Sequence, residues 1–141
     1  MNRLRHPAAL VLLTAFVVAC SPGAVATPTA GLASLGPRPS SPAVVGIVSP
    51  VSGAHVTGTT VHVVLSLTGA QIVPATTTAI TPTTGHVHLY VDNSLVSMNY
   101  GLEQDIPVTP GSHVLKAEFV AADHAPFNPR VVSAEVIFTV Q

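Results

Sequence analysis

Short stretches of alternating apolar and polar residues recur from residue 43 to the end of the chain, with turn-forming residues between them. Residues 60–68 are the clearest case, because every second residue from Val61 to Leu67 is aliphatic. Alternation with a period of two places successive side chains on opposite faces of a β-strand. No stretch keeps the 3.6-residue apolar period over the length of a helix. Residues 43–141 are therefore predicted to be built from strands.

Seven strands are expected, with turns at pairs such as Asp92-Asn93 and Pro110-Gly111. Their expected ranges are 44–48, 60–68, 86–92, 95–100, 104–108, 114–120 and 131–140. The last strand is expected to bury alternate residues, namely Val132, Ala134, Val136, Phe138 and Val140. Seven short strands without the Cys pair and Trp of antibody domains predict an all-β fold, an immunoglobulin-like or fibronectin-like antiparallel β-sandwich.

The chain opens with a different pattern, two arginines followed by an apolar run. Arg3 and Arg5 precede the run 8–18, which is about half the roughly 20 residues that a membrane-spanning helix needs. This is typical of a secretory signal. The run ends in Val17-Val18-Ala19-Cys20, which resembles the lipobox of bacterial lipoproteins. The resemblance implies that residues 1–19 are a signal peptide and that Cys20 carries lipid, anchoring the protein on the extracytoplasmic face of the cell membrane.

Residues 20–42 form the expected connection between this anchor and the strands. Ser, Pro, Gly, Ala and Thr dominate them and leave no apolar periodicity, so they are predicted to be a disordered, extended linker. Residues 43–141 are then one domain. In the alternative, an ordinary signal peptidase cleaves after Ala24-Val25-Ala26 and removes Cys20.

Composition narrows the function classes. The chain is 48% hydrophobic, 8% charged, and has a net charge of −1. Its five cations form no cluster, which excludes a basic nucleic-acid binder. One Cys cannot form a disulfide within the chain, and lipidation would account for an exported thiol. The low charge is explained by an exterior of Thr, Ser and His rather than by a membrane span.

An enzyme is not expected. Catalysis needs an activated nucleophile or paired carboxylates. The acids are scattered, and no glycine-rich phosphate loop is present. Ser133 and Glu135 are expected to face outward on a regular strand, without a partner.

The histidines offer the clearest candidate chemistry. In an immunoglobulin-like sandwich, the third and sixth strands are neighbours, and the loops before the third and after the sixth share one end. His86, His88, Asp123 and His124 should therefore converge. His-x-His on a strand places both rings on one face, and three nitrogens with one oxygen suit zinc or copper(II).

Two alternatives stay open for these residues. Met98 could add a soft ligand for copper(I), but the pattern does not place it nearby. The structural alternative is that the imidazoles pair with backbone carbonyls and Glu118 on the sheet surface, while Asp123 caps a turn.

Two aromatic residues are candidates for contact with a partner. Tyr90 is expected on the outward face of the same strand as His86 and His88. Phe127 lies in a predicted loop, residues 123–129, which two prolines stiffen. Phe127 could either anchor this loop to the sandwich or be presented to a partner.

Three motifs follow one another in this chain: Gly85-His86-Val87-His88-Leu89, then Pro110-Gly111-Ser112-His113, then Asp123-His124-Ala125-Pro126. In order and spacing the chain resembles a group of uncharacterised secreted or lipid-anchored bacterial domains, from about residue 45 to 140. Related members often carry further histidines where Val87 and Phe127 stand here. The resemblance implies a small β-sandwich at the cell envelope.

The sequence therefore favours a non-catalytic, lipid-anchored module that contacts an envelope protein or a glycan. The alternative function is copper or zinc binding through His86, His88 and His124.

Overall fold

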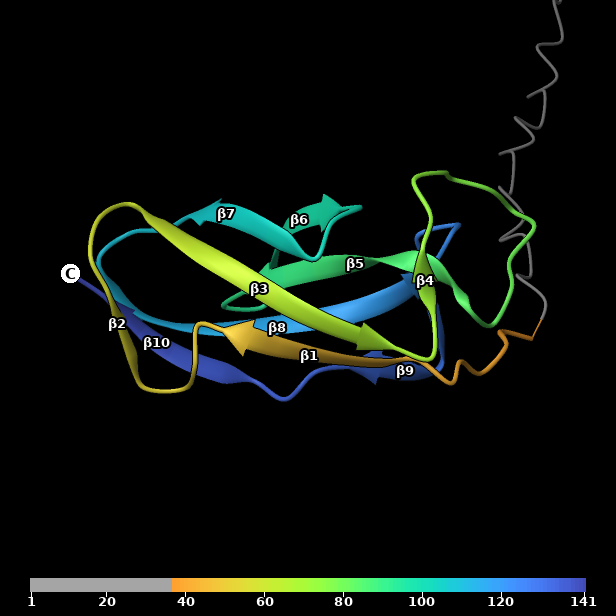
Figure 1. The fold of residues 1–141 in the computed structure, drawn as a ribbon, viewed down its shortest axis with the longest axis horizontal. Helices are drawn as coiled ribbons and strands as arrows, with labels where there is room; N and C mark the ends of the chain where they lie inside the picture. Colours follow the sequence, from red (N-terminus) through yellow and green to blue (C-terminus); the bar gives the residue numbers. More distant parts are fainter. Residues whose placement is uncertain (1–36) are drawn as a thin grey trace, which may run out of the picture. The chain divides into compact units, whose positions relative to one another are not determined.

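The computed structural model describes residues 37–141, which form ten strands in two sheets (Figure 1). The strands are β1 (Val44–Ser49), β2 (Ala54–Val56), β3 (Thr60–Thr68), β4 (Gln71–Ile72), β5 (Thr84–Val91), β6 (Ser94–Asn99), β7 (Glu103–Pro107), β8 (Gly111–Ala121), β9 (Pro126–Val132) and β10 (Val136–Val140). The predicted signal peptide, Cys20 and most of the predicted linker lie outside the described residues. Within the described range, no helix is long and apolar enough to span a membrane.

The two sheets pack as the layers of a sandwich. The smaller sheet has the order β1-β3-β7, and the larger has the order β2-β10-β8-β5-β4, with β6 paired to β5 and β9 paired to β8. All pairings are antiparallel except β2 with β10 and β4 with β5. The predicted all-β, largely antiparallel sandwich is confirmed.

The core lies between the layers and follows the alternation of the sequence. From β3, β5, β8 and β10 it receives fully or almost fully buried side chains, including Val61, Val63, Leu65, Val87, Leu89, Leu115, Ala117, Phe119 and Phe138. Burying one aliphatic or aromatic side chain of this size stabilises the folded state by about 1.5–3 kcal/mol. The opposite faces of the same strands remain available for polar side chains.

The hairpin of β5 and β6 turns at Asp92-Asn93, as predicted. Both residues have positive φ, 51° and 64°, and Val91 pairs with Ser94 across them. Two successive residues with positive φ make the type I′ turn that suits the twist of a hairpin, and Asp and Asn tolerate this conformation.

The predicted last strand is wrong in one respect, because it is broken into β9 and β10. Ser133 turns inward at the break: its Oγ accepts a hydrogen bond from the Ala117 N–H at 3.0 Å, and its own N–H donates to the Ala117 carbonyl at 2.9 Å. This interruption shifts the alternation. Val132 and Ala134 are therefore exposed rather than buried, while Val136 and the residues after it are inward as expected.

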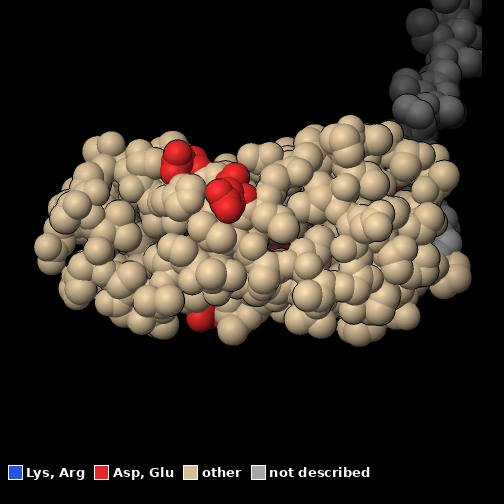
Figure 2. All heavy atoms as spheres, viewed as in Figure 1, with Lys and Arg blue, Asp and Glu red and all other residues tan. Residues whose placement is uncertain are grey.

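The surface carries few charges. The face drawn in Figure 2 is almost entirely uncharged, with a few separate acidic residues. Exposed Thr, Ser and Asn side chains take the place that ions hold in most domains.

Candidate metal centre

Three imidazoles, those of His86, His88 and His124, meet beside β5. The Nε2 atom of His86 lies 3.1 Å from Nε2 of His88 and 2.9 Å from Nδ1 of His124. One nitrogen from each ring lies within 4.8 Å of the others. His86 is completely buried and His88 is 5% exposed. The predicted convergence of these three residues is therefore found, although His124 lies 38 residues after His86 in sequence.

The topology of the larger sheet produces this convergence. Val87 and Leu89 of β5 point into the core, so His86 and His88 point to the other face of the sheet. Since β5 pairs antiparallel with β8, the turn that follows β8 returns beside the start of β5. That turn delivers His124.

His124 holds a strained backbone conformation. Its φ is 65°, in the left-handed region that costs a residue with a Cβ about 1–2 kcal/mol. Its N–H donates to the Ala121 carbonyl at 2.9 Å, and Ala121 N–H donates to the Ala125 carbonyl at 3.1 Å. These two bonds fix the turn and aim the ring of His124 at His86.

His86 and His88 point outward from the core, as the alternation predicts, but they are buried rather than exposed. The ring of Tyr100, just after β6, lies 5.3 Å from that of His86, and the ring of His124 lies 4.2 Å from it. The segment between β4 and β5 also reaches the site, since Thr76 Oγ1 lies 3.0 Å from His124 Nε2. Neighbouring turns thus cover a sheet face that alternation alone marks as open.

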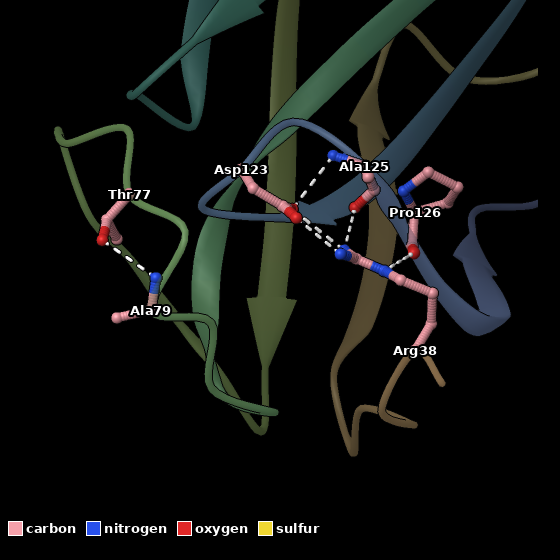
Figure 3. Close-up of polar contacts among 6 residues, drawn as sticks. All are labelled: Arg38, Thr77, Ala79, Asp123, Ala125 and Pro126. Atoms are coloured by element: carbon pink, nitrogen blue, oxygen red, sulfur yellow. Dashed lines mark hydrogen bonds and ion pairs between the residues drawn. The ribbon is translucent and has the colours of Figure 1, made fainter. Parts of the chain in front are cut away.

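Asp123 does not join the three histidines. Its two carboxylate oxygens accept hydrogen bonds from Arg38, at 2.5 and 2.9 Å, and Arg38 also donates to the carbonyls of Ala125 and Pro126 (Figure 3). Asp123 also accepts from the Ala125 N–H at 3.2 Å, so it caps the turn as the structural alternative expected. The bond to Arg38 lowers the pKa of Asp123 below its usual value.

Arg38 also changes where the packed domain begins. Residues 38–42 were expected to belong to the disordered linker, yet Arg38 holds the turn that carries His124, and the Pro39 carbonyl accepts a hydrogen bond from Asn128 N–H at 3.0 Å. The end of the linker is therefore part of the folded domain.

Burial favours the neutral form of His86 and His88. It lowers the pKa of His86 to about 4, with a further contribution from the neighbouring His124 and His88, and it also lowers the pKa of His88. Neutral imidazole is the form that ligates metals. Because the folded pKa lies below that of the unfolded chain, this contribution to stability is present above about pH 6.5 and is lost as the pH falls towards 4.

The hydrogen-bonding capacity of the cluster is not met by the chain alone. Nδ1 of His86 is buried and has no hydrogen-bond partner. Its Nε2 faces two other ring nitrogens, and a neutral imidazole carries one proton for two nitrogens. If all three facing nitrogens are bare, lone pair opposes lone pair. A cation between them would turn this repulsion into ligation.

Glu118 shares the outward face of the sheet with His88, as the alternation predicts, but it is buried, with 1% exposure. Its carboxylate accepts hydrogen bonds from Arg130 at 2.6 and 2.5 Å and from the hydroxyl of Tyr90 at 3.1 Å. It does not hydrogen-bond to the imidazoles, contrary to the structural alternative. Tyr90 is half-buried, and Lys116 Nζ lies 5.4 Å from its ring centroid. The polar end of Tyr90 is thus engaged within the chain.

Phe127 is not available to a partner. It is 2% exposed and stacks on Phe119, with ring centroids 5.6 Å apart and an interplanar angle of 12°. The predicted loop at residues 123–129 is a short turn followed by β9, which directs Phe127 into the core. The anchoring interpretation of Phe127 is confirmed.

Three residues of the site were missed: Arg38, Thr76 and Tyr100. Only Tyr100 carried a sequence signal, since a hairpin that turns at Asp92-Asn93 brings the end of β6 beside the start of β5. Arg38 and Thr76 come from Pro- and Thr-rich segments without periodicity.

The described residues thus define a β-sandwich with a buried cluster of three histidines. The chain belongs to the family described as a domain of unknown function (DUF4399), whose model matches residues 63–141. All residues of the three histidine motifs lie within this match.

One solved structure with some similarity is that of fibronectin(III)-like modules of Clostridium thermocellum CbhA. The alignment has a TM-score of 0.45 and 14% sequence identity, and it covers 70% of this chain and 45% of that one. The chain thus spans less than half the length of that structure. No curated protein sequence matches the chain.

Proposed function

We propose that the domain binds a copper or zinc ion through Nε2 of His86, Nε2 of His88 and Nδ1 of His124. The observation that carries the proposal is the convergence of these three nitrogens within 4.8 Å. Ligands bound tetrahedrally at about 2.0–2.1 Å lie roughly 3.3 Å from one another. Two of the three separations, 2.9 and 3.1 Å, are close to this value, so ligation requires little movement.

The surroundings of the cluster support the same proposal. Metal-ligating histidines usually donate the proton of the other ring nitrogen to an acceptor. Thr76 Oγ1, 3.0 Å from His124 Nε2, can accept in this way and would hold His124 in the tautomer with a bare Nδ1. The Arg38–Asp123 pair fixes the turn that carries this ring.

We place this metal-binding domain at the cell envelope, outside the cytoplasm and anchored through lipid on Cys20. The support is the Val17-Val18-Ala19-Cys20 sequence after an apolar run and the position of the only Cys. The function is non-catalytic binding. Contact with an envelope protein or a glycan stays a prediction, to which Phe127 no longer contributes because it is buried.

Metal binding can be measured on the full chain in detergent micelles, with Cys20→Ser in every variant so that no thiol competes. We expect one equivalent of zinc or copper to bind with a Kd below about 0.1 mM in isothermal titration. Replacing His86 and His88 together by Ala removes two of three ligands and should weaken binding on the order of 100-fold.

The matched control is His55→Ala with His62→Ala, because both of these side chains are exposed and lie outside the cluster. This pair should leave the affinity unchanged. Binding weaker than about 0.1 mM in the parent, or equal losses in the two double variants, contradicts the proposed function.

The anchor is tested in a bacterial host that processes lipoproteins. The parent should fractionate with membranes, whereas Cys20→Ser should leave them or accumulate unprocessed, since acyl chains cannot be attached without the thiol. Ser21→Ala is the control and should behave as the parent. Unchanged membrane fractionation of Cys20→Ser, or a mature N-terminus at Thr27, would favour ordinary cleavage.

A further inference from the structure

We propose that Met98 is a fourth, thioether ligand of this centre and makes it selective for copper(I). The inference rests on the proposed function and deepens it, because it names the ion. Met98 is the only methionine after the first residue of the chain. Thioether sulfur is a soft ligand that favours copper(I), whereas imidazole alone suits several ions.

The register of the sheet places Met98 beside the histidines. On β6, Met98 is the residue directly opposite His88 of β5. Directly opposed residues of an antiparallel pair have Cβ atoms about 4.5–5.5 Å apart and share one face of the sheet. The Met98 side chain therefore starts on the face that carries the cluster, next to one of its ligands.

A second contact confirms which face this is. Tyr100 lies two residues after Met98, and its ring lies 5.3 Å from that of His86. Tyr100 lies just beyond the end of β6, and continuing the pairing of His88 with Met98 and of Val87 with Asn99 would set Tyr100 opposite His86. Met98 is 51% exposed, so its flexible side chain is not packed into another site and can turn towards an ion at the edge of the cluster.

The charge of the site favours a monovalent ion. Zinc and copper(II) are most easily buried with an anionic ligand, because burying uncompensated charge is costly. Both nearby carboxylates are already paired, Asp123 with Arg38 and Glu118 with Arg130. Three neutral imidazoles and a thioether carry no charge. The occupied site would therefore have a net charge of one with copper(I) and of two with zinc, so copper(I) leaves less uncompensated charge.

The test compares Met98→Leu with the parent, both as full chains with Cys20→Ser in detergent. Leu keeps the size and apolar character of Met and removes the sulfur. Copper(I) affinity is measured anaerobically by competition with bathocuproine disulfonate, and zinc affinity by isothermal titration. We expect Met98→Leu to weaken copper(I) binding on the order of tenfold or more and to leave zinc affinity within about twofold.

Two further measurements separate ligation from packing. The copper X-ray absorption spectrum of the parent should contain a sulfur scatterer that is missing in Met98→Leu. Val96→Leu, which changes an exposed aliphatic side chain on the same strand, should bind both ions as the parent does.

The outcomes distinguish the two proposals. Copper(I) binding that is unchanged in Met98→Leu, with nitrogen-only scattering in the parent, overturns the inference and leaves the three-histidine site intact. Equal losses for zinc and copper(I) also overturn it, because Met98 then acts through the fold. If the parent binds neither ion, both proposals fail.

Discussion

Gly85→Ala should lower the free energy of unfolding by about 3 kcal/mol or more. If the variant no longer folds, the proposed metal binding should be lost with the fold. A Cβ at this position would lie 1.9 Å from the carbonyl oxygen of Val120, 2.9 Å from its carbonyl carbon and 3.0 Å from Cζ of Phe119. β5 and β8 would have to move apart at the end of their pairing, where Gly85 lies opposite Ala121. Overpacking usually costs about 1–3 kcal/mol, and here the obstacle is backbone that cannot rotate away.

Urea denaturation followed by circular dichroism measures this loss. Gly101→Ala is the matched control, because a Cβ there meets nothing closer than 3.6 Å and its backbone is not in the left-handed region. We expect Gly101→Ala to change stability by no more than about 0.5 kcal/mol. Equal stability of the two variants would contradict the close approach of β5 and β8 at Gly85.

This close approach gives the Gly-His-x-His motif a physical meaning. The glycine lets β8 lie tight against β5, and the turn that follows β8 then brings His124 to His86. The motif thus combines two of the three proposed ligands with the backbone feature that positions the third.

The convergence of the histidines was predictable because it depends on topology. Alternation marks which residues of a strand share a face. In a sandwich of this kind, the strands seen here as β5 and β8 are expected to be neighbours, which brings His124 to the face that carries His86 and His88. The burial of the cluster was not predictable. It depends on Tyr100, Thr76 and the turn that carries His124, which come from three separate segments.

The position of Met98 shows a further limit of sequence analysis. If the hairpin continued regularly from the pair Val91 and Ser94, Met98 would lie opposite Val87, on the core side of β5. An irregularity between Leu89 and Tyr90 shifts the register, so that Met98 lies opposite His88 instead. A shift of one residue moves every later side chain to the other face. The alternation of residues 94–99 does not predict this shift.

Arg38 was missed for a different reason. The residues around it have the composition of a linker, and its partner Asp123 lies 85 positions away. A pairing over such a distance depends on where the chain enters the fold, which composition does not specify. Because Arg38 holds the turn of His124, the segment before β1 and the histidine cluster are physically connected.

The ion pair of Glu118 with Arg130 also makes a large contribution to the free energy of unfolding. A single substitution can remove it. Burial by itself would raise the pKa of Glu118, but the hydrogen bonds and charge of Arg130, with the Tyr90 hydroxyl, hold it below its usual value. The carboxylate is therefore charged at neutral pH inside the protein, and its stabilising contribution is lost only as the pH falls through that lowered pKa.

Arg130→Met should lower the free energy of unfolding at pH 7 by about 2 kcal/mol or more, measured by urea denaturation without added metal. Removing one partner of a buried pair usually costs about 3–5 kcal/mol because the other charge is left uncompensated. The smaller figure applies here because the Arg130 side chain is 58% exposed, so water can partly replace it. Without Arg130, burial raises the pKa of Glu118, and the difference from the parent should shrink as the pH approaches 4.

The double variant Glu118→Gln with Arg130→Met decides whether the buried charge is the cause. Gln keeps the shape of Glu, can still accept the hydrogen bond of Tyr90 and carries no charge. We expect the double variant to be more stable than Arg130→Met alone and to lack the pH dependence that protonation of Glu118 gives to the single variant, because the two substitutions act on one interaction. If the double variant is as unstable as the single one, the loss arises from the packing of the Arg130 stem over β8 and β9, and the charge of Glu118 is not what Arg130 compensates.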